Sequence, residues 1–391
     1  MEVFESKPPA YSIDILEKIV TEFYGKTGDI KPLVSERDQN ARVITDDGEF
    51  VLKIANSAED PEFLDFQNSV LNHIIDIDPS LAVPAVVQGN DGQEIFQYGE
   101  NDVRLITFLK GDIFNDAPKS IALYENLGRF MGRFSTAMQG FGHAKAHQPD
   151  FLWNLDAALN CKNYINDVVG DDVKELVGYF YERYETSVAP RLKKMRSSVI
   201  HSDANNFNLV VQDEQISGLI DFGDMLFSKQ INELAITLGY AMMDVDDLFA
   251  TSNALIKGYT GEFNLTEDEL EIVFDLASMR LVMSILISSH RSIKASSKTH
   301  KEYLLITQAP AIRTLRKVKK IGLGFLAAFA RKAGGYRATS TYDALVTSLE
   351  GVKAVNMFDL IFIVNQGCFL IMLLVRRELN LFRKAKNIKN G

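Results

Sequence analysis

The chain has 391 residues, of which 46% are hydrophobic and 24% charged, and its formal net charge is −10 at pH 7. A chain of this length and composition can bury a full core over two or three domains, which excludes a disordered or fibrous protein. Its two cysteines, Cys161 and Cys368, belong to no C-x-x-C or Cys/His cluster, so the sequence indicates neither a disulfide framework nor a zinc site.

The N-terminal segment predicts one helix followed by three short strands. Residues 1–13 contain no apolar segment, so we expect no signal peptide and a cytoplasmic protein. Apolar residues at helical spacing predict a helix over 12–25. The predicted strands cover 30–35, 41–45 and 49–55, and the turns between them lie at 36–40 and 46–48.

Lys53 lies in the third predicted strand, among β-forming residues. A half-buried cation in a strand needs an anionic partner, and the α- and β-phosphates of a nucleotide would supply one. The alternative is an outward-facing lysine on an alternating strand. The position of Lys53 relative to a motif at 201–221, described below, favours the nucleotide.

A helix is predicted over 60–75, with Asp60 as its N-cap and Pro61 at its first position. It should supply a partner for Lys53. Gln67 is the first candidate and Glu62 the second. A neutral glutamine could still hold the ammonium by a hydrogen bond, although without the strength that a charged partner adds.

The segment 34–43 lies where a glycine-rich phosphate loop would be expected, but it contains no glycine. Its backbone N–H groups and the side chains of Ser35 and Asn40 could cap phosphates. A plain turn is an equal alternative.

Residues 103–109 form an apolar strand that predicts a hinge between two lobes. The backbone of Thr107, Phe108 and Leu109 would bond the nucleotide base. Beyond the hinge the chain is strongly helical, and Thr266 opens a capping box for one further helix. Apolar spacing predicts helices over 118–141, 155–169, 173–191, 231–245 and 272–292.

Two polar motifs in the second half carry the chemistry. Residues 201–208 read H-x-D-x-x-x-x-N, and residues 221–223 read D-F-G. A short β-type segment, a turn at 212–215 and an apolar strand at 216–220 join them. Either motif alone is weak evidence, whereas both in this order and context are specific to phosphoryl transfer. A β-hairpin with ordinary polar loops is the alternative.

Each motif residue has a role in that chemistry. Asp203 would orient the attacking hydroxyl and accept its proton, while Asn208 and Asp221 would offer hard oxygen ligands to Mg²⁺. The predicted phosphoryl donor is a nucleotide.

The chain resembles the aminoglycoside phosphotransferase and choline kinase superfamily, and within it the hydroxylysine kinase-like branch, which occurs alone or fused to class III aminotransferases. The resemblance spans about residues 12–315, and the segments that carry it are 35–40, 50–56, 151–155 and 218–225. It implies a small-molecule kinase with MgATP or MgGTP as donor and an amino-alcohol or amino-sugar hydroxyl as acceptor.

The resemblance also implies an α+β, protein-kinase-like fold with two lobes. A small antiparallel-sheet lobe would cover residues 1–109, and a larger, mainly helical lobe residues 110–335. In the family pattern His201 holds the catalytic loop by hydrogen bonds, and we assign it that scaffold role. Ser202 replaces the usual glycine or asparagine, and we expect this to be tolerated because its side chain need not touch substrate.

Four residues are candidates for the acceptor site, each with a structural alternative. Asp224 and Glu233 could receive an ammonium group or could satisfy groups near the loop, and the structural role is favoured for Glu233 because it lies inside a predicted helix. Trp153 could wall the acceptor pocket or belong to the core. Arg291 could reach an acceptor carboxylate or lie at a solvated helix end.

The C-terminal segment 336–391 is basic and partly apolar. Residues 313–391 hold 15 Lys and Arg against four Asp and Glu, a net +11, so residues 1–312 carry −21. The net negative charge of residues 1–312 argues against nucleic acid as a partner and suits a cationic substrate. Residues 357–375 could span a membrane, but three polar side chains make this costly. We favour a helix packed on the second lobe, a homodimer contact or the remnant of a fused domain.

Two hypotheses therefore remain open. The first is an active kinase for a small hydroxylated amine. The second is a catalytically silent, kinase-like protein that binds nucleotide or a partner, motivated by Gln67, the glycine-free loop and the C-terminal segment. Retention of Lys53, Asp203, Asn208 and Asp221 together favours the first.

Overall fold

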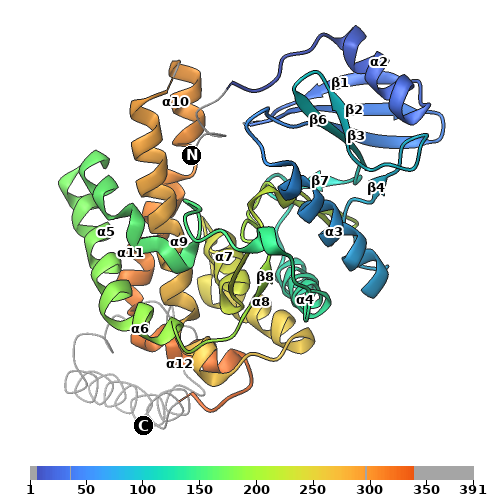
Figure 1. Ribbon diagram of the computed structural model, residues 1–391. Coiled ribbons are helices and arrows are strands. Elements are labelled where there is room, and N and C mark those ends of the chain that lie inside the picture. The colour runs from blue at the N-terminus through green and yellow to red at the C-terminus, as the bar shows by residue number, and fades with distance from the viewer. Residues whose placement is uncertain (1–6, 36, 296, 339–391) are drawn as a thin grey trace, which may run out of the picture.

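The computed structural model describes residues 7–35, 37–295 and 297–338. A sheet with one covering helix forms one end of the molecule, and helices form the rest, as Figure 1 shows. The predicted α+β, two-lobed architecture is confirmed. Two separate hydrophobic cores underlie it, a small one in the sheet region and a large one in the helical region.

The first region is an antiparallel sheet whose strands run in the order β1-β2-β3-β6-β4, with β5 also paired to β6. Side chains of β2 and β3 alternate between buried and half-buried, so one face packs on the core. The strands are β1 (Asp29–Leu33), β2 (Gln39–Thr45), β3 (Gly48–Ile54), β4 (Val86–Val87), β5 (Phe96–Tyr98) and β6 (Asn101–Thr107).

Helix α2 (Ile13–Tyr24) covers this sheet and confirms the first predicted helix. It follows Ser12 at the N-cap and ends at Gly25, which adopts a left-handed conformation with φ 62°. Its buried side chains, which include Leu16 and Ile19, complete the small core.

Helix α3 (Pro61–Ile77) begins as predicted, with the Asp60 side chain accepting the Glu62 N–H at 2.9 Å. Its apolar face joins the large core rather than the small one, through residues such as Phe66 and Val70. The helix thus packs with the helical region although it follows the sheet strands in sequence.

The second region is built around α9 (Glu267–Ile293), whose residues from Glu269 to Ser289 are all buried except Glu271. The Thr266 capping box that the sequence predicts is present. Packed against α9 are α5 (Asp171–Arg183), α7 (Ile231–Ala241), α10 (Lys298–Leu304), α11 (Gln308–Ile321) and α12 (Leu323–Ala333). Helix α4 (Ile121–Ala137) packs against α8 (Leu248–Glu262), and α6 (Ala189–Leu192) completes the set.

Two predicted helices have a different local form. The segment predicted over 155–169 is a run of 3₁₀ turns (Leu155–Asp167) with a kink at Ala157. The helix predicted over 173–191 consists of α5, a π-helical turn (Tyr184–Val188) and α6. Apolar spacing reports the helical face but not the hydrogen-bond register along it, so the sequence could not distinguish these forms.

Five short strands hold the two motif segments. Strand β8 (Ser197–Ile200) enters the first segment and β9 (Leu209–Gln212) leaves it, while β10 (Gln215–Leu219) enters the second and β11 (Leu226–Lys229) leaves it. Because β10 pairs with β9 and β11 with β8, the two segments must lie side by side. Strand β7 (Asp112–Ile113) adds to β9.

The described residues contain no helix long and apolar enough to cross a membrane. The segment 357–375 lies outside the described residues, so the membrane, homodimer and fused-domain alternatives for it stay predictions.

Candidate active site

His201 joins the two motif segments. Its Nε2 lies 3.1 Å from the Ile220 carbonyl oxygen, and its Nδ1 lies 3.3 Å from the backbone nitrogen of Asp203. The carbonyl requires a proton on Nε2, and the Asp203 N–H requires a lone pair on Nδ1, so the ring is neutral. Burial lowers the pKa of His201 to about 4, in agreement with that tautomer. This geometry supports the scaffold role assigned to His201.

Glu233, on α7, accepts a hydrogen bond from the backbone of the same loop. Its Oε2 accepts the backbone N–H of His201 at 2.6 Å, and the residue is fully buried. Burial raises the pKa of Glu233 to about 8. This carboxylate oxygen bonds the loop backbone, which is the structural role that the sequence favoured.

The backbone is bent sharply at both motifs. Ser202 has φ 67° and Asp221 has φ 62°, both in the left-handed region that non-glycine residues rarely adopt. This conformation explains why glycine or asparagine is usual at the position of Ser202. Both bends follow the end of a strand, and the carboxylates of Asp203 and Asp221 are close enough to interact electrostatically.

The carboxylate of Asp203 is held on both sides. Its Oδ2 accepts the side-chain amides of Asn205 at 2.9 Å and Asn208 at 2.8 Å, and its Oδ1 accepts Nη2 of Arg280 at 2.8 Å. Burial raises the pKa of Asp203 to about 7, although Arg280 opposes the shift. A carboxylate with this pKa is suited to accept a proton near neutral pH.

Arg280 is a site residue that the sequence analysis missed. It lies midway along α9 and is 1% exposed. Its Nε donates to the Tyr240 hydroxyl at 3.2 Å and its Nη1 to the Trp153 carbonyl at 3.1 Å. Fully buried arginines are rare unless paired, so an arginine inside the apolar run 276–287 was a signal that a buried acid lies nearby.

Trp153 lies against this arginine. Its ring centroid is 4.6 Å from Arg280 Cζ, a cation–π distance, and the side chain is half-buried. The tryptophan therefore borders the Asp203 carboxylate through Arg280, and a role in the acceptor pocket stays a prediction.

Asn208 and Asp221 are brought together by the paired strands. The Ile220 N–H donates to the Asn208 carbonyl at 2.9 Å, and the Asn208 side-chain nitrogen donates to Asp203. The Asn208 amide oxygen is thereby the end left to face a cation. Burial raises the pKa of Asp221, but Lys53 and Arg37 more than offset it, so the pKa lies below its usual value and the group is ionised.

This donor set fits a magnesium–nucleotide complex. No cluster of three or more His, Cys, Asp and Glu side chains that could hold a metal occurs among the described residues. Mg²⁺ commonly uses only one or two protein oxygens and completes its shell with phosphates and water. One carboxylate and one amide oxygen are enough for that mode.

The partner of Lys53 is not the one expected. Its Nζ lies 3.9 Å from a carboxylate oxygen of Asp38, in the loop between β1 and β2. Gln67 instead accepts Nη2 of Arg104, the β6 residue directly opposite Lys53 in the sheet. Glu62, the second candidate, pairs with Lys145 at 2.7 Å. Arg104 is fully buried and needs the polar face of α3, which explains why that helix does not serve Lys53.

Ser35, Arg37 and Asp38 precede β2, which begins at Gln39. The Ser35 hydroxyl accepts the Asp38 N–H at 3.3 Å, and Asn40 lies opposite Lys53 in the β2–β3 register. The Asn40 Oδ1 atom is buried without a hydrogen-bond partner. A buried amide oxygen without a hydrogen-bond partner, in the strand position opposite Lys53, is expected in a site that binds a polar ligand.

Two of the three backbone amides of the predicted hinge are already hydrogen-bonded within the sheet region. The Thr107 N–H donates to the Ala85 carbonyl and the Phe108 N–H to the Glu49 carbonyl, both at 2.9 Å. Of the three amides expected to face a base, that of Leu109 therefore remains the candidate. The Leu109 side chain packs closely against Gly218 on β10.

Two acceptor candidates lie at different distances from the loop. Asp224 is near it, and its Oδ1 accepts Nη2 of Arg37 at 2.9 Å. Arg291 lies eleven residues beyond Arg280 on α9, roughly 16 Å along the axis. The structure does not bring Arg291 together with Asp203.

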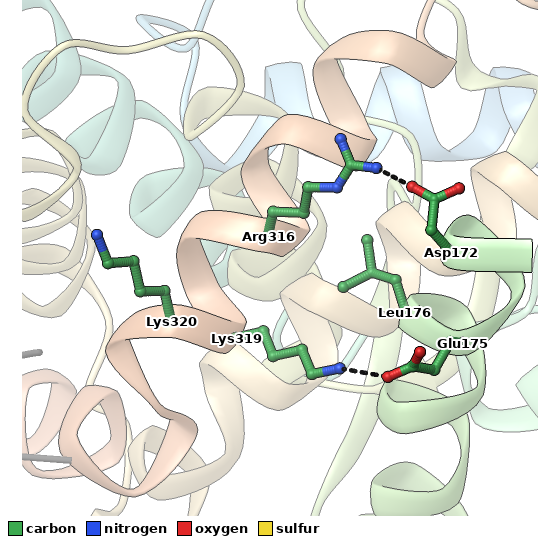
Figure 2. Close-up of a pocket in the computed structure, with 6 residues that line it drawn as sticks. All are labelled: Asp172, Glu175, Leu176, Arg316, Lys319 and Lys320. Carbon is green, nitrogen blue, oxygen red and sulfur yellow. Dashed lines mark hydrogen bonds and ion pairs between the residues drawn. The ribbon is translucent and has the colours of Figure 1, made fainter. Parts of the chain in front are cut away.

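A pocket of about 340 Å³ lies elsewhere, between α5 and α11 (Figure 2). Exposed ion pairs border it: Arg316 with Asp172, and Lys319 with Glu175 at 3.7 Å. None of the motif residues lines it, and exposed pairs of this kind contribute little energy. We therefore locate the chemistry at the motifs.

Known sequences resemble the part of the chain that contains the motifs. The profile of the family described as "Phosphotransferase enzyme family" matches residues 29–266, which include both motifs and Lys53. Hydroxylysine kinase of Danio rerio is 28% identical over 340 residues, covering 82% of this chain and 95% of that kinase. Homoserine kinase of Zymomonas mobilis is 27% identical over 238 residues, covering 59% of this chain and 71% of that enzyme.

Solved structures share the fold. The amicoumacin kinase hAmiN, in complex with AMP-PNP, Ca²⁺ and Ami, superposes with a TM-score of 0.59 at 14% identity, covering 78% of this chain and 94% of that one. A microcompartment-associated aminopropanol kinase gives a TM-score of 0.53 at 14% identity, covering 84% and 100%.

Proposed function

The chain belongs to the phosphotransferase enzyme family, and on that premise we propose that it transfers the terminal phosphoryl group of ATP or GTP, bound with Mg²⁺, to the hydroxyl of a small amine-bearing acceptor. The observation that carries the proposal is the network that holds Asp203 between Asn208 and Arg280, with His201 joining it to the strand before Asp221. In this proposal Asp203 is the base, and Asn208 and Asp221 are the metal ligands.

Each motif residue has a separate role in the proposed reaction. Asp203 orients the acceptor hydroxyl and receives its proton, and Lys53 binds the nucleotide phosphates. Asn208 and Asp221 would hold Mg²⁺, which neutralises charge on the phosphate oxygens when bound. His201 and Glu233 hold the loop and contact no reacting atom.

We further propose that the acceptor is an amino alcohol or a hydroxylated amino acid. The hydroxylysine and homoserine kinases that this chain resembles act, by their names, on molecules that carry both an amine and a hydroxyl. The carboxylates of Asp203 and Asp224 favour a cationic acceptor, and so does the net charge of −21 on residues 1–312.

The silent alternative makes a different prediction. A kinase-like binding protein would bind nucleotide without turnover, and the glycine-free loop before β2 is the feature that favours it. Binding measurements alone cannot separate the two proposals, because both predict binding.

Turnover separates them. Nucleotide consumption would be measured with ATP and with GTP, in Mg²⁺, against hydroxylysine, ethanolamine, choline, homoserine and aminoglycosides. Asp203→Asn removes the proposed base with little change in shape, and Asp246→Asn, at an exposed position, is the matched control. Turnover with one acceptor that Asp203→Asn abolishes and Asp246→Asn retains supports the kinase. Nucleotide binding with no turnover across the panel supports the silent alternative.

A further inference from the structure

Arg37 crosses from the sheet region to the second motif. It lies in the glycine-free loop before β2, yet its Nη2 is 2.9 Å from Oδ1 of Asp224, 187 residues further along the chain. A Cβ atom built on Gly223 would lie 3.0 Å from the same nitrogen and 3.3 Å from Oδ1 of Asp221. The guanidinium therefore lies along residues 221–224, close to the carboxylates of Asp221 and Asp224.

The charges around Arg37 form one cluster. Burial lowers the pKa of Arg37, but Asp224, Asp221 and Asp38 together raise it above its usual value. Lys53 approaches the same cluster, since it pairs with Asp38 and acts on Asp221. Two cations from the sheet region thus converge on the carboxylate that we assign to the metal.

Asn56 fixes the backbone of the loop that carries Arg37. The Asn56 side-chain nitrogen donates to the Arg37 carbonyl at 3.3 Å, and the Asn56 N–H donates to Asp38 Oδ1 at 3.4 Å. Asn56 is buried just after β3. The backbone of the loop is thereby tied to the end of the strand that carries Lys53.

Because the loop before β2 contains no glycine, it needs another source of positive charge for phosphates, and Arg37 is placed to supply it. A glycine-rich loop approaches phosphates closely because it has no Cβ atoms, and its N–H groups bond the phosphate oxygens. Residues 34–40 all carry side chains, so such an approach is sterically hindered. A side-chain cation that reaches past the loop is the other way to supply positive charge.

We propose that Arg37 is a catalytic residue that contacts the terminal phosphate of the bound nucleotide; this rests on the proposed function. During transfer the acceptor oxygen bonds to the terminal phosphorus and the bond to the bridging oxygen breaks, its electrons leaving with the nucleoside diphosphate. The hydroxyl proton passes to Asp203. Arg37 stabilises the charge on the equatorial phosphate oxygens, which is greatest in the transition state.

The competing explanation is a purely structural ion pair between the two regions. That pair can be broken from either side, by Arg37→Gln or by Asp224→Asn. A structural pair predicts the same loss in both variants and for every nucleotide. A phosphate contact predicts a loss in the Arg37 variant that grows with the number of phosphates.

The test is calorimetric binding of AMP, ADP and AMP-PNP, with Mg²⁺, to the full chain. We expect Arg37→Gln to weaken AMP-PNP binding about 10- to 100-fold, as for loss of a charged hydrogen bond, ADP binding less, and AMP binding not at all. Arg37→Lys, which keeps the charge, should recover part of the loss. Arg129→Gln, which removes an exposed ion pair on α4, is the matched control and should bind like wild type.

Three results would overturn the assignment: equal losses for all three nucleotides, a matching pattern in Asp224→Asn, or unchanged AMP-PNP binding in Arg37→Gln. If Arg37→Gln does not fold, as judged by thermal melting, Arg37→Lys decides by whether its AMP-PNP to AMP preference falls below that of wild type. Failure of the proposed function shows separately, because wild type would then lack turnover whatever Arg37 does.

Discussion

Arg280 and Asp203 form an ion pair inside the helical region, with Arg280 Nη2 2.8 Å from Asp203 Oδ1 and the arginine 1% exposed. Asn208 holds the other carboxylate oxygen. The proposed base therefore has a fixed orientation before any acceptor arrives, and α9, at the centre of the helical region, provides it.

Replacing Arg280 with methionine should lower kcat about 10- to 100-fold, since a charged hydrogen bond that orients the base is lost. The affinity for AMP-PNP should stay within a few-fold of wild type, because Arg280 contacts none of Lys53, Asn208 or Asp221. Steady-state kinetics and calorimetry measure the two effects. Arg280→Lys should restore part of kcat.

Arg183→Met is the control for that variant. It breaks another ion pair to α9, with Asp275, which does not belong to the hydrogen-bond network around Asp203. It should lower the melting temperature without a comparable loss of kcat. A wild-type kcat in Arg280→Met would contradict the positioning role.

Replacing Asp221 with asparagine should raise the Mg²⁺ concentration needed for half-maximal activity by at least about 10-fold, because the site loses its charged oxygen ligand. A magnesium titration of activity, with metal binding measured in the presence of AMP-PNP, checks this. An unchanged magnesium requirement would show that Asp221 is not a ligand.

Glu233 makes stability depend on pH. Its pKa is raised by burial to about 8 in the folded protein, from an ordinary value of 4.5. The folded state therefore binds the extra proton between these values, and the contribution is present at low pH and lost as pH rises toward 8. The groups facing it are His201 and Asp203 on the loop and Tyr259 on α8.

Glu233→Gln should remove this dependence while its amide oxygen still accepts the His201 N–H. The free energy of unfolding of the variant relative to wild type should rise with pH, by up to about 1.4 kcal/mol per unit between pH 5 and 8. Urea unfolding at three pH values measures it. A difference that is constant with pH would mean that Glu233 is ionised throughout.

Helices α4 and α8 cross at glycines. A Cβ atom on Gly258 would lie 2.1 Å from the Glu125 carbonyl oxygen, whereas one on Gly261 of the same helix would meet nothing within 4 Å. Gly258→Ala should therefore destabilise the protein by about 1–3 kcal/mol. Gly261→Ala, the matched control, should be neutral or stabilising by up to about 1 kcal/mol. Denaturant unfolding of both variants compares them, and equal effects would contradict the close crossing.

The sequence by itself determined the fold class and the position of the two motifs to which we assign the chemistry. Side-chain periodicity is local, so the first helix, the strands around Lys53 and the capping box at Thr266 could be predicted from neighbouring residues. The spacing of His201, Asp203, Asn208 and Asp221 is also local, because one hairpin joins the two motifs.

The tertiary structure decided the partners of the charged residues. Lys53 pairs with Asp38 and not with Gln67, because the buried Arg104 on the adjacent strand takes the polar face of α3. Arg280 reaches Asp203 across 77 residues and Arg37 reaches Asp224 across 187. Charge pairs form wherever packing leaves two opposite charges out of water, and packing between distant segments has no signature in the spacing of residues along the chain.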